Sequence, residues 1–191
     1  MDGARDTWGM KRGADKEVSG GVEFVGADIV HLDKNTFMWV QLTHFAISLA
    51  ESDEVLLASL IASPAYAHDY ASPCPSHPQP FDTAIHGRWN LSAIAVDRFV
   101  PRPSADAIAQ LKHWANDQDW TDPDYRQPQE VLKRLDSVFD LMRSGAVYQL
   151  DNPSDDDMHE YGFVTGEMGF HEFVVINHPA QALHVIVASD D

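Results

Sequence analysis

Two strongly apolar segments near the end of the chain, residues 170–176 and 183–188, constrain the fold more than any other feature. Both are rich in β-branched and aromatic residues, and turn-forming residues separate them, which predicts a β-hairpin. Pairing of Asn177 with Ala182 divides the side chains between two faces. The first face carries Val174, Ile176, Leu183, Val185 and Val187, and the second carries Phe173, Val175, His184 and Ile186. Because both faces are largely apolar, we expect the hairpin to lie at the centre of a sheet or to be covered on both sides.

Three earlier segments carry β signals of differing strength. Residues 22–32 are apolar and β-branched, and Gly26 interrupts them, which predicts one strand with a bulge or two short strands. Residues 37–49 mix aromatic and β-branched residues and fit a helix or a strand. Residues 89–100 alternate between apolar and polar side chains, and Pro101 follows them, which predicts a further strand that ends there.

Three segments carry helix signals. Residues 53–63 begin with two acidic residues, which the helix dipole favours in a first turn. Residues 104–114 follow a good N-cap, Ser104, and place apolar residues at a helical spacing. Residues 128–144 carry the clearest pattern, with a proline suited to the first helical position. The apolar stripe of this last helix consists of Val131, Leu135, Val138, Phe139 and Met142.

Together these elements predict an α+β fold, in which a mainly antiparallel sheet has two or three helices packed on it and the C-terminal hairpin is central. Residues 1–20 are rich in glycine and lack a hydrophobic period, so we expect a flexible N-terminal tail before a single domain over residues 21–191. No apolar run reaches the roughly 18 residues of a membrane span. Cys74 is the only cysteine, so we expect a cytoplasmic protein without a disulfide.

The chain is strongly acidic, with a formal net charge of −17 at pH 7. After Arg143 it contains neither lysine nor arginine. Such a surface repels phosphates and attracts cations and basic proteins. We therefore expect no direct binding of nucleic acid and take a basic protein as the candidate partner. An acidic surface with few lysines is also typical of salt-adapted proteins, so the charge by itself leaves that alternative open.

Acidic residues gather in two predicted loops, residues 117–124 and 151–157. Trp120 lies in the first loop, and an exposed aromatic side chain within an acidic rim is typical of an interface for a basic partner. The first loop can also hold a divalent cation weakly, but it contains a proline and lacks the glycine of an EF-hand. The interface candidates are Trp120, Asp117, Asp119, Asp122, Asp124, Asp155, Asp156 and Asp157.

A proline-rich stretch, residues 63–80, carries a candidate metal site. Cys74 and His77 have the spacing of a zinc-binding pair, and His68 and His86 are candidates for a further ligand. Zinc sites usually show two such close pairs, whereas this chain has one pair, and its 10 histidines are scattered. An ordinary solvated loop is the alternative.

The final hairpin carries candidate acid–base residues. His171 and Glu172 are neighbours on a strand, so they face opposite sides of the sheet, and His171 can share a face only with His184. A histidine on a mostly apolar face is more often a core residue than a catalyst. The chain contains no G-x-S-x-G motif for a nucleophilic serine and no glycine motif for phosphate binding.

Two functions remain after these exclusions. The first is a non-catalytic binding protein or inhibitor, such as an immunity protein, an antitoxin or a nucleic-acid mimic, whose acidic face captures a basic partner. The second is a small metal-assisted hydrolase that uses Asp and His ligands from loops. The lack of a catalytic motif favours the first, for which we expect no cofactor.

Overall fold

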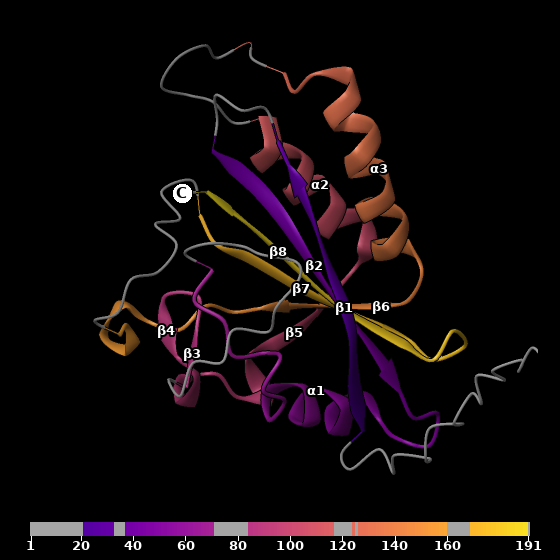
Figure 1. The fold of residues 1–191 in the computed structure, drawn as a ribbon, viewed down its shortest axis with the longest axis vertical. Coiled ribbons are helices and arrows are strands. Elements are labelled where there is room, and N and C mark those ends of the chain that lie inside the picture. Colours follow the sequence, from indigo (N-terminus) through magenta and orange to yellow (C-terminus); the bar gives the residue numbers. More distant parts are fainter. Residues whose placement is uncertain are drawn as a thin grey trace, which may run out of the picture.

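The computed structural model describes residues 21–32, 37–70, 84–116, 124, 126–159 and 169–190. The strands are β1 (Val22–His31), β2 (Met38–Ile47), β3 (Ile85–His86), β4 (Trp89–Asn90), β5 (Phe99–Arg102), β6 (Ala146–Leu150), β7 (His171–Asn177) and β8 (Ala182–Asp190). The helices are α1 (Asp53–Ile61), α2 (Ser104–Asn116) and α3 (Gln129–Arg143), with short 3-10 helices η1 (Leu91–Ala93), η2 (Val96–Arg98) and η3 (Asp155–Asp157). Six strands form one antiparallel sheet in the order β1-β2-β8-β7-β6-β5, and β3 and β4 form a second, two-stranded sheet (Figure 1).

The hairpin of β7 and β8 lies at the centre of the large sheet, as its two apolar faces predicted. Asn177 pairs with Ala182, which is the register expected from the sequence. Phe173 faces one core of the protein and Val174 faces the other, and neither side chain has any exposed surface. The predicted α+β fold with a central C-terminal hairpin is therefore confirmed.

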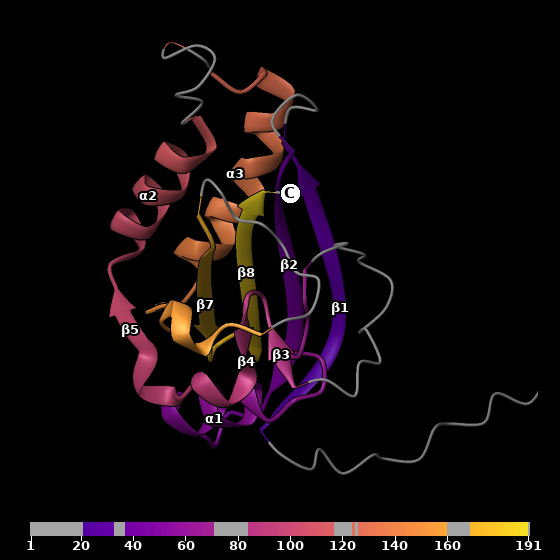
Figure 2. The ribbon, with the colours of Figure 1, turned by 90° about the vertical axis from the view of Figure 1, so that its left-hand side faces the viewer.

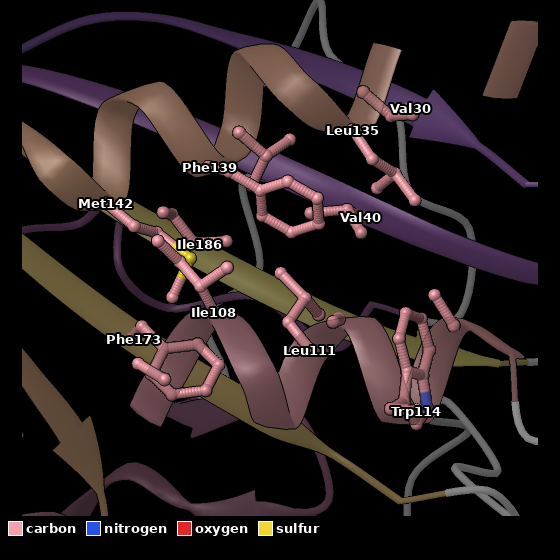
Figure 3. Packing of buried hydrophobic residues seen from close by; sticks show 14 of the residues in the cluster. Val30, Val40, Ile108, Leu111, Trp114, Leu135, Phe139, Met142, Phe173 and Ile186 are labelled. Carbon is pink, nitrogen blue, oxygen red and sulfur yellow. The ribbon is translucent and has the colours of Figure 1, made fainter. Parts of the chain in front are cut away.

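Helices α2 and α3 cover one face of the sheet (Figure 2). Figure 3 shows Leu111 of α2 and Phe139 of α3 between the helices and the strands, where they pack in one cluster with Val40 and Ile186. The apolar stripe predicted for α3 is buried along its whole length. Pro128 is the N-cap of this helix rather than its first residue, a shift of one position.

Helix α1 and the short sheet of β3 and β4 cover the opposite face. Leu56, Leu57 and Leu60 are the buried residues of α1, and they share a cluster with aromatic residues of the loops and strands. Ser52 caps the helix, because its hydroxyl oxygen accepts a hydrogen bond from the Val55 N–H at 3.4 Å. The sheet is thus buried between two apolar layers, and both are needed to cover the central hairpin.

One predicted strand was wrong. Residues 89–100 do not form a continuous strand, because β4 ends at Asn90, β5 begins at Phe99, and η1 and η2 lie between them. Polar residues such as Ser92 and Asp97 favour local turns over a strand ladder, which the apparent alternation concealed. Pro101 lies inside β5, where an edge strand tolerates it.

The other β predictions differ from the structure in smaller ways. Residues 37–49, which fitted a helix or a strand, contain β2. The bulge expected at Gly26 lies just before that glycine, because the pairing of β1 with β2 shifts between Phe24 and Gly26. Strand β6 was not predicted from the sequence. Residues 1–20 lie outside the described residues, so the division into a tail and a domain over residues 21–191 stays a prediction. No helix in the described ranges is long and apolar enough to cross a membrane.

Candidate functional site

A buried polar network lies on the sheet face that α1 covers. Its centre is Glu172 of β7, whose side chain has no exposed surface. The Tyr66 hydroxyl donates a hydrogen bond to one carboxylate oxygen at 2.7 Å, and the His86 Nε2 atom lies 2.6 Å from the other. Both carboxylate oxygens are therefore satisfied, as a buried acid requires.

Strand alternation places Glu172 in this layer, and the short sheet brings its partners. Phe170 and Val174, two residues to either side of Glu172, belong to the same core cluster. His68 and His86 form a parallel bridge, in which the His68 N–H donates to the Ile85 carbonyl at 3.0 Å. The loop after α1 is thereby fixed against β3 and above β7.

The turn after His86 depends on a glycine. Gly87 has a positive φ of 57°, and a Cβ atom added there would lie 2.8 Å from the Phe170 ring. A residue with a side chain is disfavoured by both the backbone conformation and the contact. The His86 ring is therefore placed by a turn that only glycine fits easily.

The hydrogen bonds fix the number of protons in the network. The His86 Nδ1 atom lies 2.6 Å from the Tyr66 carbonyl oxygen, which can only accept, so Nδ1 carries a proton. One further proton lies between Nε2 and the Glu172 carboxylate. Whichever atom holds it, the His86–Glu172 pair has no net charge. Burial, followed by the nearby Glu172, raises the pKa of Tyr66 well above its usual range, so its phenol stays protonated and continues to donate.

His68 is one of the groups in this layer with a hydrogen-bonding atom that has no partner among the described residues, and Trp89 is another. Its Nδ1 accepts from the Tyr70 N–H at 2.8 Å, so a neutral ring carries its proton on Nε2. That Nε2 is buried and has no hydrogen-bond partner among the described residues. Burial lowers the pKa of His68 to about 4, although the neighbouring Asp69 acts in the opposite direction. His68 is therefore neutral at pH 7.

The network holds its members in place more readily than it transfers a proton. Both ring nitrogens of His86 are engaged, and the ring stacks on Tyr66 with centroids 3.9 Å apart. Both carboxylate oxygens of Glu172 are engaged as well, and the side chain has no exposed surface. The arrangement joins the loop after α1, β3 and β7, while the buried Nε2 atom of His68 has no hydrogen-bond partner among the described residues.

The structure brings two of the four predicted metal ligands together. His68 and His86 lie side by side, whereas Cys74 and His77 lie outside the described residues. Within the described part of the chain, no group of three or more His, Cys, Asp and Glu side chains is arranged to hold a metal ion. The metal site stays a prediction.

The predicted interface residues are only partly described. Asp155 and Asp156 are exposed in η3, while Asp157 is partly buried and its carboxylate accepts from the Ser154 hydroxyl at 3.0 Å. Asp124 is exposed. The remaining candidates, Trp120, Asp117, Asp119 and Asp122, lie outside the described residues.

The two histidines of the final hairpin share a sheet face, as expected, but have different partners. The His171 ring lies 3.3 Å from the Gln110 amide and packs against buried Trp114. His184 contacts His44 through their Nδ1 atoms, which are 2.8 Å apart. Burial, together with His44, lowers the pKa of His184 to about 4. The pair joins β2 to β8 rather than forming a site with His171.

A second polar group on the α1 side was not predicted. The His178 Nε2 atom lies 2.6 Å from one Asp53 carboxylate oxygen, and the Tyr148 hydroxyl donates to the other. Burial and the hydrogen bond to Asp53 raise the pKa of Tyr148 to about 12. This group connects the start of α1 to β6 and to the turn between β7 and β8.

Among the described residues, fixed positive charge is confined to one stretch of the sequence. All described lysines and arginines lie between Arg88 and Arg143. Strands β1, β2, β6, β7 and β8 and helix α1 therefore carry none, although exposed carboxylates lie on β1 and α1. Helices α2 and α3 carry Lys112, Lys133 and Arg134. The β1–α1 side of the protein is thus acidic without a fixed positive charge among its described residues.

Comparison of the chain with protein-family models, curated proteins and solved structures finds no match.

The buried network predicts a strong energetic coupling. Replacing either Glu172 or His86 with leucine leaves its partner unpaired in the core, so each change should lower the free energy of unfolding by about 3–5 kcal/mol. The double variant removes both groups and should lose less than the sum, by about 0.5–3 kcal/mol. Chemical denaturation of the four proteins measures this coupling, and additive losses would contradict the paired arrangement.

The lowered pKa of His68 predicts loss of stability in acid. In the unfolded chain this histidine takes up a proton below about pH 6.5, whereas the folded protein resists until about pH 4. Stability is therefore complete above pH 6.5 and falls as the pH drops toward 4, by up to about 1.4 kcal/mol per pH unit for this one group. His68→Asn keeps an acceptor for the Tyr70 N–H and should flatten the slope relative to the wild-type protein. Denaturation midpoints between these pH values measure the slope of both proteins, and an unchanged slope in His68→Asn would refute the assignment.

Proposed function

We propose that this chain is a non-catalytic binding protein that captures a basic protein partner through its acidic surface. The observation that carries the proposal is the separation of charge over the fold. Lysine and arginine are absent from β1, β2 and α1, where Glu23, Glu51 and Glu54 lie at or near the surface. An inhibitor of the immunity or antitoxin type has this character, because it must meet a basic surface quickly and specifically.

The separation of charge supports association rather than stability. Like charges on one side of a protein repel each other and disfavour the compact state. The excess of carboxylates therefore lowers the stability of the free protein, and a basic partner relieves this repulsion. A uniformly acidic surface that serves solubility or salt adaptation has no need to keep lysine and arginine away from β1, β2 and α1.

The buried network supports the same conclusion from another direction. The His86–Glu172 pair is neutral, closed to solvent and fully engaged, which suits a scaffold that keeps a surface rigid. The alternative, a metal-assisted hydrolase, rests on His68 and on side chains outside the described residues. Elemental analysis separates the two, since stoichiometric zinc, manganese or iron would favour the hydrolase. For the binding protein we propose a reducing, cytoplasmic setting, which suits a lone cysteine.

The proposal predicts an association rate that depends on salt and on exposed carboxylates. The native partner, recovered by cross-linking in the source cells, should associate more slowly when salt rises from about 50 mM to about 500 mM, because exposed charges are then screened. Asp155→Asn with Asp156→Asn should slow association further at low salt. Asp157 is left unchanged because its carboxylate accepts hydrogen bonds from the N–H and the hydroxyl of Ser154, the N-cap of η3.

The matched control removes two positive charges instead. Lys133→Gln with Arg134→Gln alters the exposed face of α3 and should leave association unchanged or faster. Stopped-flow mixing measures all three proteins. If the rate responds neither to salt nor to the aspartate changes, the acidic surface does not serve capture.

A further inference from the structure

The two edge strands of the large sheet, β1 and β5, differ in how readily they can pair with another strand. Strand β5 is short and contains Pro101 and Arg102, which block or discourage pairing with another strand. Strand β1 is the longer edge, with 10 residues, and contains no proline, lysine or arginine (Figure 2). Exposure runs along most of it, reaching 68% at the bulged Val25. Strand β5 is thus protected, whereas no described strand pairs with the outer side of β1.

The hydrogen-bond alternation identifies the open backbone groups of β1. The Leu32 N–H donates to the Met38 carbonyl at 2.9 Å. Because every second residue of a strand points its backbone groups to the same side, those of Val30 and Asp28 also point toward β2. The backbone groups of the residues between them point away from the sheet. These outward residues are Ala27, Ile29 and His31 on one side of the bulge, and Val22 and Phe24 on the other.

A groove lies beside this edge, where β1 begins and β2 ends. Its volume is about 470 Å³, and Glu23, Glu51, Val55 and Ser59 are among the residues that line it. Val55 is an apolar side chain of α1 that remains 43% exposed. A lysine or arginine can lay its aliphatic stem on such a surface while its charged end meets the carboxylates. The groove therefore fits the side chain of a basic residue.

We propose that β1 and this groove bind an extended segment of the partner that carries lysine or arginine. The segment adds a strand to the sheet through the outward backbone groups of β1, and one basic side chain enters the groove between Glu23 and Glu51. The bulge at Val25 places Glu23 and Asp28 on the face of β1 that carries Val30, where the Asp28 carboxylate lies 3.2 Å from the His44 Nε2 atom. A further basic residue on this face of the added strand meets Asp28. This inference rests on the proposed function and assigns its place on the fold.

Charge selects this occupant over a second copy of the chain. Pairing of β1 with β1 of another molecule would bring together two strands that each carry Glu23 and Asp28 and no lysine or arginine. The described residues of this side offer no lysine or arginine to offset that repulsion. A basic segment meets the same carboxylates with opposite charge.

Two synthetic peptides of about ten residues test the proposal. The first alternates valine and threonine with a lysine near each end, so that it can form a strand. The second has the same charge but contains prolines at alternate positions, so that it cannot add to a sheet. Fluorescence anisotropy of labelled peptides should show the first binding the full chain at least about tenfold more tightly than the second.

Protein variants locate the site. Glu23→Gln with Glu51→Gln should weaken the strand-forming peptide about tenfold, whereas Asp97→Asn with Asp106→Asn, an equal loss of exposed charge elsewhere, should change it by less than about twofold. Ala27→Pro removes one outward N–H, and should weaken the peptide while the protein still melts cooperatively.

The outcomes separate this inference from the proposed function. Equal binding of both peptides, or equal effects of the two charge pairs, would overturn the β1 site and leave only general electrostatic capture. Dimers that form through β1 and disappear in Ala27→Pro would assign the edge to a second copy and also overturn it. If the binding of the native partner does not depend on salt concentration, the proposed function itself is refuted.

Discussion

The burial of β7 and β8 on both faces is the constraint on which the rest of this structure depends. A strand with apolar side chains above and below must lie inside a sheet that is covered twice, and two layers are present: α2 and α3 on one face, and α1 with the short sheet on the other. The same constraint makes the burial of Glu172 unfavourable, because the alternation of side chains along β7 directs its carboxylate into the core. Tyr66 and His86 satisfy it, and in doing so they fix the loop after α1 and β3 against the sheet.

Sequence reasoning succeeded where the signal was local. The register of the final hairpin and the buried stripe of α3 follow from periodicity, which neighbouring residues determine. It failed where a tight local turn interrupts the pattern or where distant segments decide the outcome. Residues 89–100 alternate like a strand, yet Trp89 pairs back to His86 in a tight turn and the following residues form 3-10 helices. Residues 37–49 became a strand only because β1 and β8 pair with them on either side.

The sequence correctly predicted that His68 and His86 lie close together, but it did not predict the hydrogen bonds that they make. His68 and His86 were linked as metal ligands through their place around a proline-rich segment, and the structure does put them side by side, but hydrogen bonds occupy both nitrogens of His86. A usable signal was present in Glu172, a charged residue at a core-facing position of the most apolar strand. Tyr66 had no such signal, because its partner lies far away in the chain. The interior is thus neutral and closed, while the β1–α1 side is acidic and ends in an open strand, which is the division expected of a rigid protein that binds through its surface.

Amide hydrogen exchange along β1, followed by NMR, tests the central claim most directly, because it reports on the open edge in the free protein and on its occupation. The account predicts that the outward amides of Ala27, Ile29 and His31 exchange much faster than those of Asp28 and Val30, and that a bound strand-forming basic peptide slows the outward set alone. Equal protection of the two sets in the free protein, or no change on binding, would contradict an open edge that receives the partner.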